Sequence, residues 1–139
     1  EIVTSSIKNI APLCDLKNIN IEKKLSEDIK INCDLNWQVE ALTNILKNCV
    51  EHSYENSKIE ITASANKVYA SIKIRDYGTG ISPEDLPHIF ERFYKGKDAS
   101  FESVGIGLAL AKKIIESNDG IIGVTSNNQG TKFTIKYPY

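Results

Sequence analysis

Hydrophobic residues recur along this chain with two different periods. In three segments they return at every third or fourth position, which is the spacing of one face of an α-helix. These segments are 3–17, 37–54 and 105–117. Pro12 should bend or end the first predicted helix, because proline lacks the backbone N–H that a helix interior needs. Asp34 or Asn36 can cap the second one.

Other segments alternate between apolar and polar residues, as strands with one buried face do. They are 19–25, 29–33, 58–65, 68–75, 121–126 and 131–137. Turn residues predict a turn at 26–28 and hairpin turns at 66–67 and 127–130. Ser82-Pro83-Glu84-Asp85 predicts the start of a short helix. The polar stretch 95–104 has neither period and predicts a loop.

This order of elements predicts an α+β fold in which a mixed sheet of five to six strands carries helices on one face, a two-layer sandwich. We expect residues 1–18 to be a linker or the end of a preceding helical segment and residues 19–139 to form one domain. The chain has no methionine and begins with Glu1, so we expect it to be a piece of a longer polypeptide.

Composition excludes several classes of protein. The net charge is −1 with acidic and basic residues mixed along the chain, which provides no basic field for nucleic acid. No apolar run reaches the roughly 18 residues of a membrane helix, and no signal peptide is apparent. The three isolated cysteines, Cys14, Cys33 and Cys49, indicate reduced thiols in a cytosolic protein. The two histidines are too far apart to suggest a metal centre.

A carboxylate followed by two glycines, Asp76-x-Gly78-x-Gly80, comes directly after a predicted strand. The carboxylate can accept hydrogen bonds from an amino group, and the glycines allow the backbone to approach a planar ligand closely. The alternative is a glycine-rich turn that simply leaves the strand.

Three polar residues, Asn44, Asn48 and His52, are spaced to line one flank of the predicted helix 37–54. Asparagine is a poor residue for a helix interior, and its amide oxygen suits Mg²⁺. Alternatively, both asparagines bond neighbouring backbone or face solvent. Gly105 and Gly107 lie where a loop becomes a helix, which suits an anion site or merely a flexible helix entry.

Better-known nucleotide and ion motifs are absent from the sequence. The only Gly-Lys pair, Gly96-Lys97, continues with Asp98 and so does not form a P-loop. Pro83 and Leu110 occupy the third-glycine positions of the two possible G-x-G-x-x-G motifs. A calcium loop starting at Asp76 would place Pro87 where a glutamate is needed.

Five short motifs identify a family resemblance that extends from about residue 35 to residue 137. They are Asn44-x-x-x-Asn48, Asp76-x-Gly78-x-Gly80, Phe90-Glu91-Arg92-Phe93-Tyr94-Lys95, Gly105-x-Gly107-Leu108 and Gly130-Thr131. They resemble the N, G1, F, G2 and G3 boxes of the catalytic ATP-binding domain of bacterial sensor histidine kinases. That domain belongs to the GHKL superfamily, with type II topoisomerases, mismatch-repair ATPases and the ninety-kilodalton chaperones, and has a Bergerat-type ATP-binding fold. The F box with a short lid favours the histidine kinases.

The resemblance implies an ATP site with adenine near the first glycine motif. Asp76 would accept a hydrogen bond from the 6-amino group of adenine. Gly78 and Gly80 would let the loop pass under the base, with Ile81 among the cofactor-binding residues. Thr131 would lie near the adenine, in contact through water.

The resemblance also implies how the phosphates are held. Asn48 would be the Mg²⁺ ligand and, with Lys95, would form the catalytic pair, since Lys95 would reach the γ-phosphate. Asn44 would support the triphosphate, and His52 would lie against the nucleotide. The residues closing on the phosphates would be Gly105, Gly107 and Leu108.

Two residues depart from the pattern of the family. Glu51 stands where these kinases usually have Lys or Arg, so we expect weaker nucleotide affinity than in a Lys-bearing relative. Cys49 stands where a small residue is usual and is interpreted as an apolar filler. The resemblance further implies that residues 95–104 form an ATP lid, ordered only with nucleotide, and that Arg92 helps to place the lid or a partner domain.

The resemblance implies a protein-histidine kinase that donates the γ-phosphoryl group of ATP. Neither His52 nor His88 lies in a phosphoacceptor motif, so the acceptor histidine would belong to a separate dimerisation domain, with a response regulator downstream. We expect a cytosolic domain of a membrane-anchored parent that does not itself contact the membrane. The alternatives are a regulatory nucleotide-binding module without transfer, favoured by Glu51, and a related serine kinase or lid-dimerising ATPase, which the F box disfavours.

Overall fold

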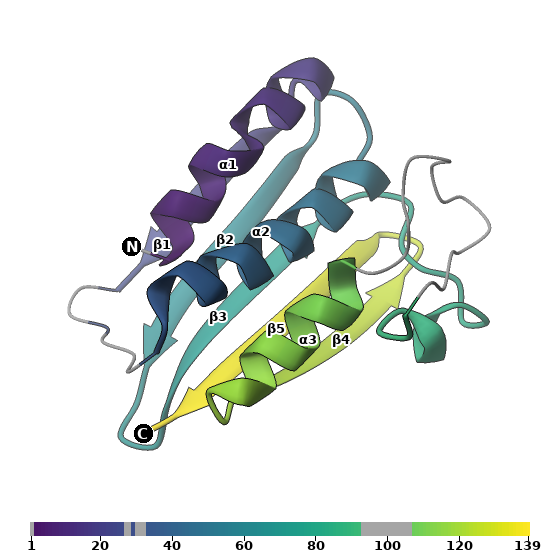
Figure 1. The fold of residues 1–139 in the computed structure, drawn as a ribbon. Helices are drawn as coiled ribbons and strands as arrows, with labels where there is room; N and C mark the ends of the chain where they lie inside the picture. The colour runs from purple at the N-terminus through teal and green to yellow at the C-terminus, as the bar shows by residue number, and fades with distance from the viewer. Residues whose placement is uncertain (1, 27–28, 30–32, 93–106) are drawn as a thin grey trace.

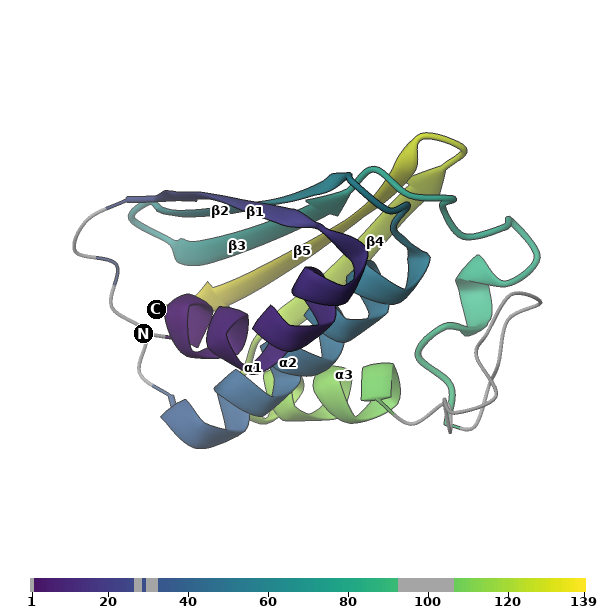
Figure 2. The same cartoon turned by 90° about the horizontal axis from the view of Figure 1, so that it is seen from above.

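The computed structural model describes residues 2–26, 29, 33–92 and 107–139 of the chain. Its elements follow the predicted order (Figure 1). They are α1 (Ile2–Lys17), β1 (Asn20–Leu25), α2 (Leu35–His52), β2 (Lys58–Ala65), β3 (Tyr69–Asp76), the 3₁₀ helix η1 (Leu86–His88), α3 (Gly107–Ser117), β4 (Ile121–Asn127) and β5 (Gly130–Pro138). All three α-helices cover the same face of one sheet (Figure 2). The predicted two-layer α+β fold is therefore confirmed.

The sheet has five strands in the order β1-β2-β3-β5-β4. Strand β1 runs parallel to β2, and the other neighbouring strands are antiparallel. Because β3 and β5 pair antiparallel with Arg75 opposite Lys132, the end of β3 meets the beginning of β5. This register brings the residues that follow Arg75 next to Thr131 and Gly130.

The core lies between the sheet and the helices, and alternate residues of each strand point into it from the sheet. Its fully buried side chains include Ile59, Ile61, Ile74, Phe133 and Ile135 from the sheet and Ile10, Ile45, Leu46 and Ile115 from the helices. One polar residue of this core, Gln38, joins three elements. Its amide donates to the carbonyl of Ile114 and to Asn118 after α3, and accepts from the hydroxyl of Tyr137 in β5.

Helix α1 continues through Pro12 to Lys17. The expectation that Pro12 could end the helix was therefore wrong. Pro12 itself is exposed, but Ile10 before it and Cys14 after it are buried against the rest of the core. Packing on both sides thus holds the helix together where the proline removes a backbone donor. Polar contacts add to the packing, since Asn9 donates to the hydroxyl of Thr43 in α2. The assignment of residues 1–18 to a preceding helical segment stays a prediction.

The central helix α2 begins and ends two residues earlier than predicted. Asp34, and not Asn36, is its N-cap and accepts from the N–H of Trp37. At the other end the backbone of Ser53 is extended, and its hydroxyl donates to the carbonyl of Cys49. The helix therefore stops at His52 because Ser53 satisfies a carbonyl that another turn would have used.

The remaining differences from the predicted elements are local. The short helix expected from Ser82 is a turn followed by the single 3₁₀ turn η1, since the carbonyl of Ser82 accepts from both Asp85 and Leu86. The β4–β5 hairpin closes more tightly than predicted, with both strands extended into the turn at 127–130. The strand predicted at 29–33 and the loop at 95–104 lie outside the described residues, except for Ile29 and Cys33, which are not in a strand.

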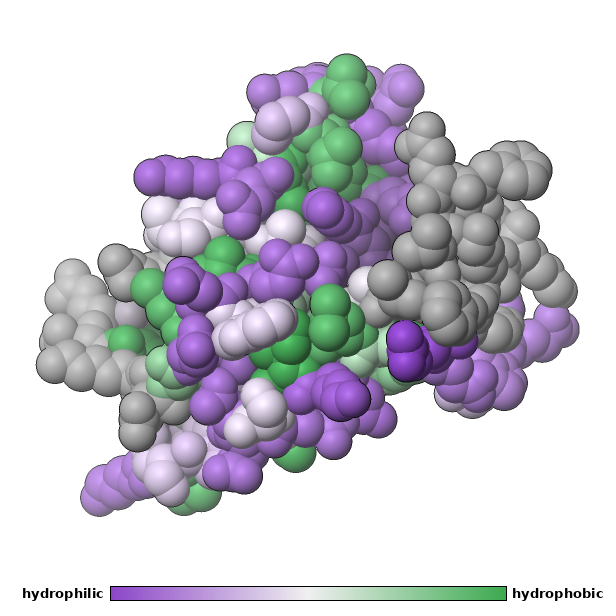
Figure 3. Space-filling view, in the orientation of Figure 1, coloured by the Kyte–Doolittle hydropathy of each residue, from purple (hydrophilic) through white to green (hydrophobic). Residues whose placement is uncertain are grey.

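Seen from the helix side, the surface mixes hydrophilic residues with small groups of apolar ones (Figure 3). The large apolar side chains that are exposed come from several elements, among them Leu16 in α1, Trp37 in α2 and Leu110 in α3. Of the helices that the structure describes, none combines the length and the hydrophobicity that crossing a membrane would require.

Candidate functional site

The buried carboxylate of Asp76 is the centre of the candidate site. Asp76 is the last residue of β3 and only 1% exposed. One of its oxygens, Oδ1, accepts hydrogen bonds from the backbone N–H groups of Gly78 and Thr131, both at 3.1 Å. The loop after β3 and the beginning of β5 therefore hold the carboxylate from two sides, and neither of these bonds uses its other oxygen.

Burial raises the pKa of the Asp76 carboxyl above its ordinary value. The two backbone N–H groups act in the opposite direction, as do the nearby His52 and a hydrogen bond from Cys49. Burial also raises the pKa of the Cys49 thiol well above its ordinary value, so the thiol stays protonated near neutral pH. Cys49 is fully buried beside this carboxylate, and its interpretation as an apolar filler stays a prediction.

The loop after Asp76 is wedged against the end of α2. A Cβ added at Gly78 would lie 1.9 Å from the carbonyl oxygen of His52. The same oxygen accepts from the N–H of Thr79 at 3.1 Å. No larger residue fits at Gly78 without moving the backbone, so the glycine permits close approach between two parts of this protein. Close approach of this loop to a planar ligand stays a prediction.

The β4–β5 hairpin holds the other side of this loop. Gly80 has a φ of +75°, and a Cβ there would lie 1.8 Å from the carbonyl oxygen of Asn127. Gly130 has a φ of +134°, and a Cβ there would lie 2.1 Å from the carbonyl oxygen of Asp76. Both positions therefore require glycine for their backbone angle as well as for space.

A hydroxyl that the sequence analysis missed connects the loop to the hairpin. Ser126 Oγ accepts from the N–H of Ile81 at 2.7 Å. It also lies 2.8 Å from the hydroxyl of Thr131, close to the carboxylate of Asp76. The available signal was its position, because Ser126 shares the core-facing parity of Ile122 and Val124 in an alternating strand. A polar residue on the apolar side of such a strand suggests a specific partner.

The flank of α2 carries Asn44, Asn48 and His52, as predicted, and all three side chains are half-buried. The first residues of α3 face this flank, since a Cβ added at Gly107 would lie 3.8 Å from the side chain of Asn44. Leu108, next in α3, packs against the core. The structure thus brings the N-terminal end of α3 next to the neutral amide of Asn44, one helical turn from Asn48.

Lys17 is a second contributor that sequence reasoning missed. Its ammonium group donates to the carbonyl oxygens of Val50, Glu51 and Ser53 at 2.9–3.0 Å. A cation here satisfies carbonyls at the C-terminal end of α2 and interacts favourably with the helix dipole. The end of α2 is where His52 meets the glycine loop, so Lys17 fixes one wall of the site. Its only sequence signal was a basic residue in the last turn of a helix.

Some predicted site residues are not tested by these contacts. Lys95 and Gly105 lie outside the described residues. Glu51 and Arg92 are exposed, on α2 and after η1 respectively. Within the part of the chain that the structure describes, no group of three or more His, Cys, Asp or Glu side chains could hold a metal. The assignment of Asn48 as a metal ligand stays a prediction.

The site as a whole combines two kinds of recognition. Near β3 it offers a buried acceptor framed by rigid backbone, which suits a neutral amino group on a flat ring. Near α2 and α3 it offers neutral amide groups and the N-terminal end of a helix, which suit an anionic group. A ligand with a flat amino-bearing ring at one end and an anionic chain at the other matches both parts.

Comparison with known proteins agrees with this arrangement. The family model described as histidine kinase-, DNA gyrase B-, and HSP90-like ATPase matches residues 33–139. Sensor histidine kinase YvrG of Bacillus subtilis is 34% identical over 80% of this chain and 20% of its own length. Sensor protein SrrB of Staphylococcus aureus is 32% identical over 98% of this chain and 26% of its own length. The chain thus spans about a fifth to a quarter of the curated relatives it matches.

Solved structures show the same fold. The catalytic domain of histidine kinase ThkA has a TM-score of 0.86 and 24% identity, covering 99% of this chain and 92% of that one. ThkA has also been solved in complex with the response regulator protein TrrA. Full-length ShkA in complex with AMPPNP has a TM-score of 0.83 and 25% identity, covering 99% of this chain and 29% of that one.

Proposed function

This chain belongs to the family of histidine kinase-, DNA gyrase B- and HSP90-like ATPases, and we propose that it is the Mg-ATP-binding catalytic domain of a sensor histidine kinase. In this proposal it donates the γ-phosphoryl group of ATP to a histidine on a separate dimerisation domain. The support comes from the site geometry together with relatives that are themselves named sensor kinases.

The observation that carries the proposal is the buried, backbone-held carboxylate of Asp76. The 6-amino group of adenine is a hydrogen-bond donor, whereas guanine carries an acceptor oxygen at the same position. A carboxylate in a dry, rigid setting would therefore favour ATP strongly over GTP, because the mismatched pair would leave two acceptors facing each other. Gly78, Gly80, Ile81 and Thr131 would complete the adenine side.

On the phosphate side, the residues fit a metal held mainly by its substrate. Mg²⁺ usually keeps several waters and takes one or two protein ligands together with phosphate oxygens. Asn48 can supply one neutral amide oxygen, and Asn44 lies one turn away beside Gly107. When bound, the ion would neutralise charge on the phosphates. We propose that His52, Lys95, Gly105, Gly107 and Leu108 contact the nucleotide, with Lys95 and Asn48 as the catalytic pair.

In the transfer step, a ring nitrogen of the acceptor histidine would bond to the γ-phosphorus as the bond to the β-phosphate oxygen breaks. ADP would leave, and the proton of the imidazole would pass to a base on the acceptor domain. The catalytic domain would supply position and charge stabilisation, which is most of what phosphoryl transfer needs. The complex of ThkA with TrrA supports a response regulator as the downstream partner.

Calorimetric titration tests the nucleotide part of this proposal. ATP and GTP would be titrated with and without Mg²⁺ into the wild-type chain, Asp76→Asn and the control Asp119→Asn, which lies after the far end of α3. We expect ATP but not GTP to bind, and Asp76→Asn to weaken ATP binding about 100-fold, because an amide donor would then oppose the amino group. Absence of ATP binding by the wild-type chain, or equal loss in both variants, would contradict the proposal.

A nucleotide-binding regulatory module without transfer is the second candidate. Glu51 favours it, because this exposed carboxylate is on the helix that carries Asn48 and His52. Mixing the chain and labelled ATP with the isolated acceptor hairpin of a related sensor kinase separates the two candidates. Acid-labile label on the hairpin that depends on its histidine supports the kinase. ATP binding without any label on the hairpin supports the regulatory module.

A further inference from the structure

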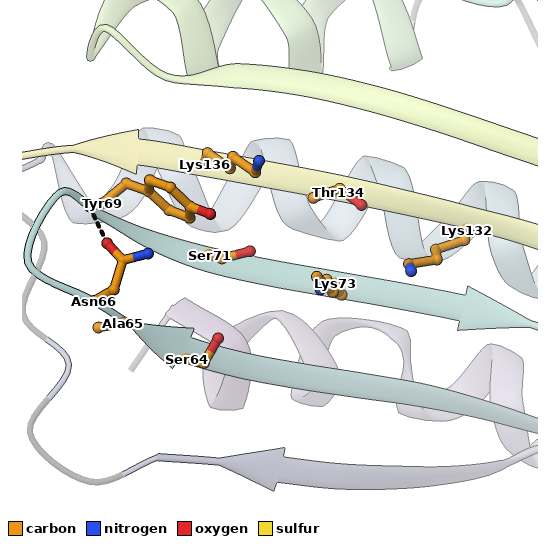
Figure 4. A pocket seen from close by; sticks show the side chains of 9 residues that line it. All are labelled: Ser64, Ala65, Asn66, Tyr69, Ser71, Lys73, Lys132, Thr134 and Lys136. Carbon is orange, nitrogen blue, oxygen red and sulfur yellow. Dashed lines mark hydrogen bonds between the residues drawn. The ribbon is translucent and has the colours of Figure 1, made fainter.

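The face of the sheet opposite the helices carries a second concave site. All three α-helices lie on one side, and no described element covers the other side (Figure 2). On this open face, residues of β2, β3 and β5 line a half-open cavity of about 390 Å³ (Figure 4). This volume is within the usual range for sites that bind small molecules.

The lining of this cavity is strongly cationic. It includes Lys73 from β3 and Lys132 and Lys136 from β5, and none of its lining residues is acidic. Among the described residues none of the three lysines forms an ion pair, although Lys136 lies over the ring of Tyr69 at 4.8 Å. Three like charges that line one concave surface make the local potential positive, which attracts an anion.

A buried hydroxyl without a partner lies at the floor of the cavity. Ser71 is 4% exposed, and its Oγ makes no hydrogen bond with any described residue. In the sheet register it is directly opposite Lys136 on one side and Ser64 on the other (Figure 4). A buried polar atom that lacks a partner is rare in native proteins and calls for a ligand or a water at that point.

This cavity and the candidate ATP site are on opposite faces of the same strand. Ser71 and Lys73 have the odd positions of β3, which face away from the helices, whereas Ile72, Ile74 and Asp76 have the even ones. Ser71 and Asp76 are also five residues apart, or roughly 17 Å along an extended strand. A molecule in the cavity would therefore not occupy the place of the adenine.

We propose that the open-face cavity binds a small molecule carrying phosphate groups. Ammonium groups of Lys73, Lys132 and Lys136 provide charge, and the hydroxyls of Ser71 and Thr134 provide additional donors. A phosphate group offers several acceptor oxygens and up to two negative charges, and lysine is a common ligand for it. Tyr69 forms one end of the cavity, and its ring lies beneath the ammonium group of Lys136.

Titration with inorganic pyrophosphate, followed by ¹H–¹⁵N NMR of the full chain, tests the proposal. We expect shifts in the amides of Ser71, Lys73 and Thr134 that saturate together at millimolar concentration. Lys136→Gln should weaken this binding about tenfold, as expected for losing one charge-assisted hydrogen bond, and leave ATP affinity unchanged. Lys8→Gln, on the exposed side of α1, is the matched control and should have no effect.

Two further arms make the result decisive. Ser71→Ala should weaken pyrophosphate binding while leaving the free chain as stable or more stable, because it removes an unpartnered buried hydroxyl. Citrate, which carries carboxylates, should bind more weakly than pyrophosphate. The proposal is overturned if shifts appear only around Gly78 and Gly107, if Lys8→Gln weakens binding as much as Lys136→Gln, or if citrate binds as tightly as pyrophosphate.

Discussion

The buried polar side chains on the two faces of strand β3 differ in how many hydrogen bonds they form with the protein. On the helix side, Asp76 receives two backbone hydrogen bonds and a thiol contact, from the glycine loop, β5 and α2. On the open side, Ser71 is almost as deeply buried but has no partner among the described residues. A fully held carboxylate can be aimed at one atom of a ligand, because the protein has already met the cost of ordering it. The hydroxyl of Ser71 has no such support from the protein, and on our proposal it is free to bond a ligand atom.

The largest expected contrast is between a glycine packed against the end of α2, Gly78, and a glycine with open space around it, Gly123. Gly78→Ala would force a Cβ to within 1.9 Å of the His52 carbonyl, so the loop or the end of α2 must move. We expect a loss of about 3 kcal/mol or more in unfolding free energy, with loss of ATP binding. Gly123→Ala is the control, since a Cβ there meets nothing within 4 Å, and should change stability by less than about 1 kcal/mol. Urea denaturation measures both, and equal effects would remove the contrast.

Two lysines extend the comparison to paired and unpaired cations. Lys17→Gln removes an ammonium group that donates hydrogen bonds to three carbonyls at the end of α2. We expect this to lower the free energy of unfolding by about 1–2 kcal/mol. Lys73→Gln removes one of three like charges around the open-face cavity, and should leave stability unchanged or slightly raised. Thermal unfolding of both variants at low and high salt tests this. A Lys17→Gln variant as stable as the wild type would show that the carbonyls find water equally well.

A smaller effect is expected at Glu51. Glu51→Lys should tighten ATP binding roughly threefold to fivefold, because an exposed charge near the phosphates acts through solvent and is screened by salt. Glu40→Lys makes the same charge change on an exposed part of α2 about three turns away and serves as the control. Calorimetry at two salt concentrations measures both, and unchanged or weaker binding in Glu51→Lys counts against a repulsive role for this carboxylate.

The smallest expected effect is the pH dependence that the burial of Asp76 produces. Its pKa in the folded chain is raised above the ordinary 3.8. Between the ordinary pKa and the raised pKa of the folded chain, Asp76 holds its proton more often in the folded chain than in the unfolded chain. Stability therefore falls as pH rises through this window. Asp76→Asn lacks this term, and its stability relative to the wild type should therefore increase as pH rises from below 3.8 toward neutrality. Urea denaturation across this range measures it, and a constant difference would exclude the shift.

Much of the fold follows from local patterns that can be read along the chain. Periods of three to four residues and of two residues placed nearly every described helix and strand, because each buries one face against the same core. The position of Asp76 between a strand and a glycine pair was likewise visible locally, as was the stripe of Asn44, Asn48 and His52 on α2. Continuity of α1 through Pro12 was not, since it depends on packing against α2.

By itself, the sequence determined which residues face the core and which residues could recognise a nucleotide. Only the tertiary structure decided what they meet: Cys49 with Asp76, the end of α2 with Lys17, and Gly78 with the His52 carbonyl. It also decided that Lys136 lies beside Ser71, because that neighbour depends on β5 pairing with β3 in one register. The physical reason is that periodicity reports only the direction of a side chain, whereas the strand order and helix packing of the whole chain choose its partner.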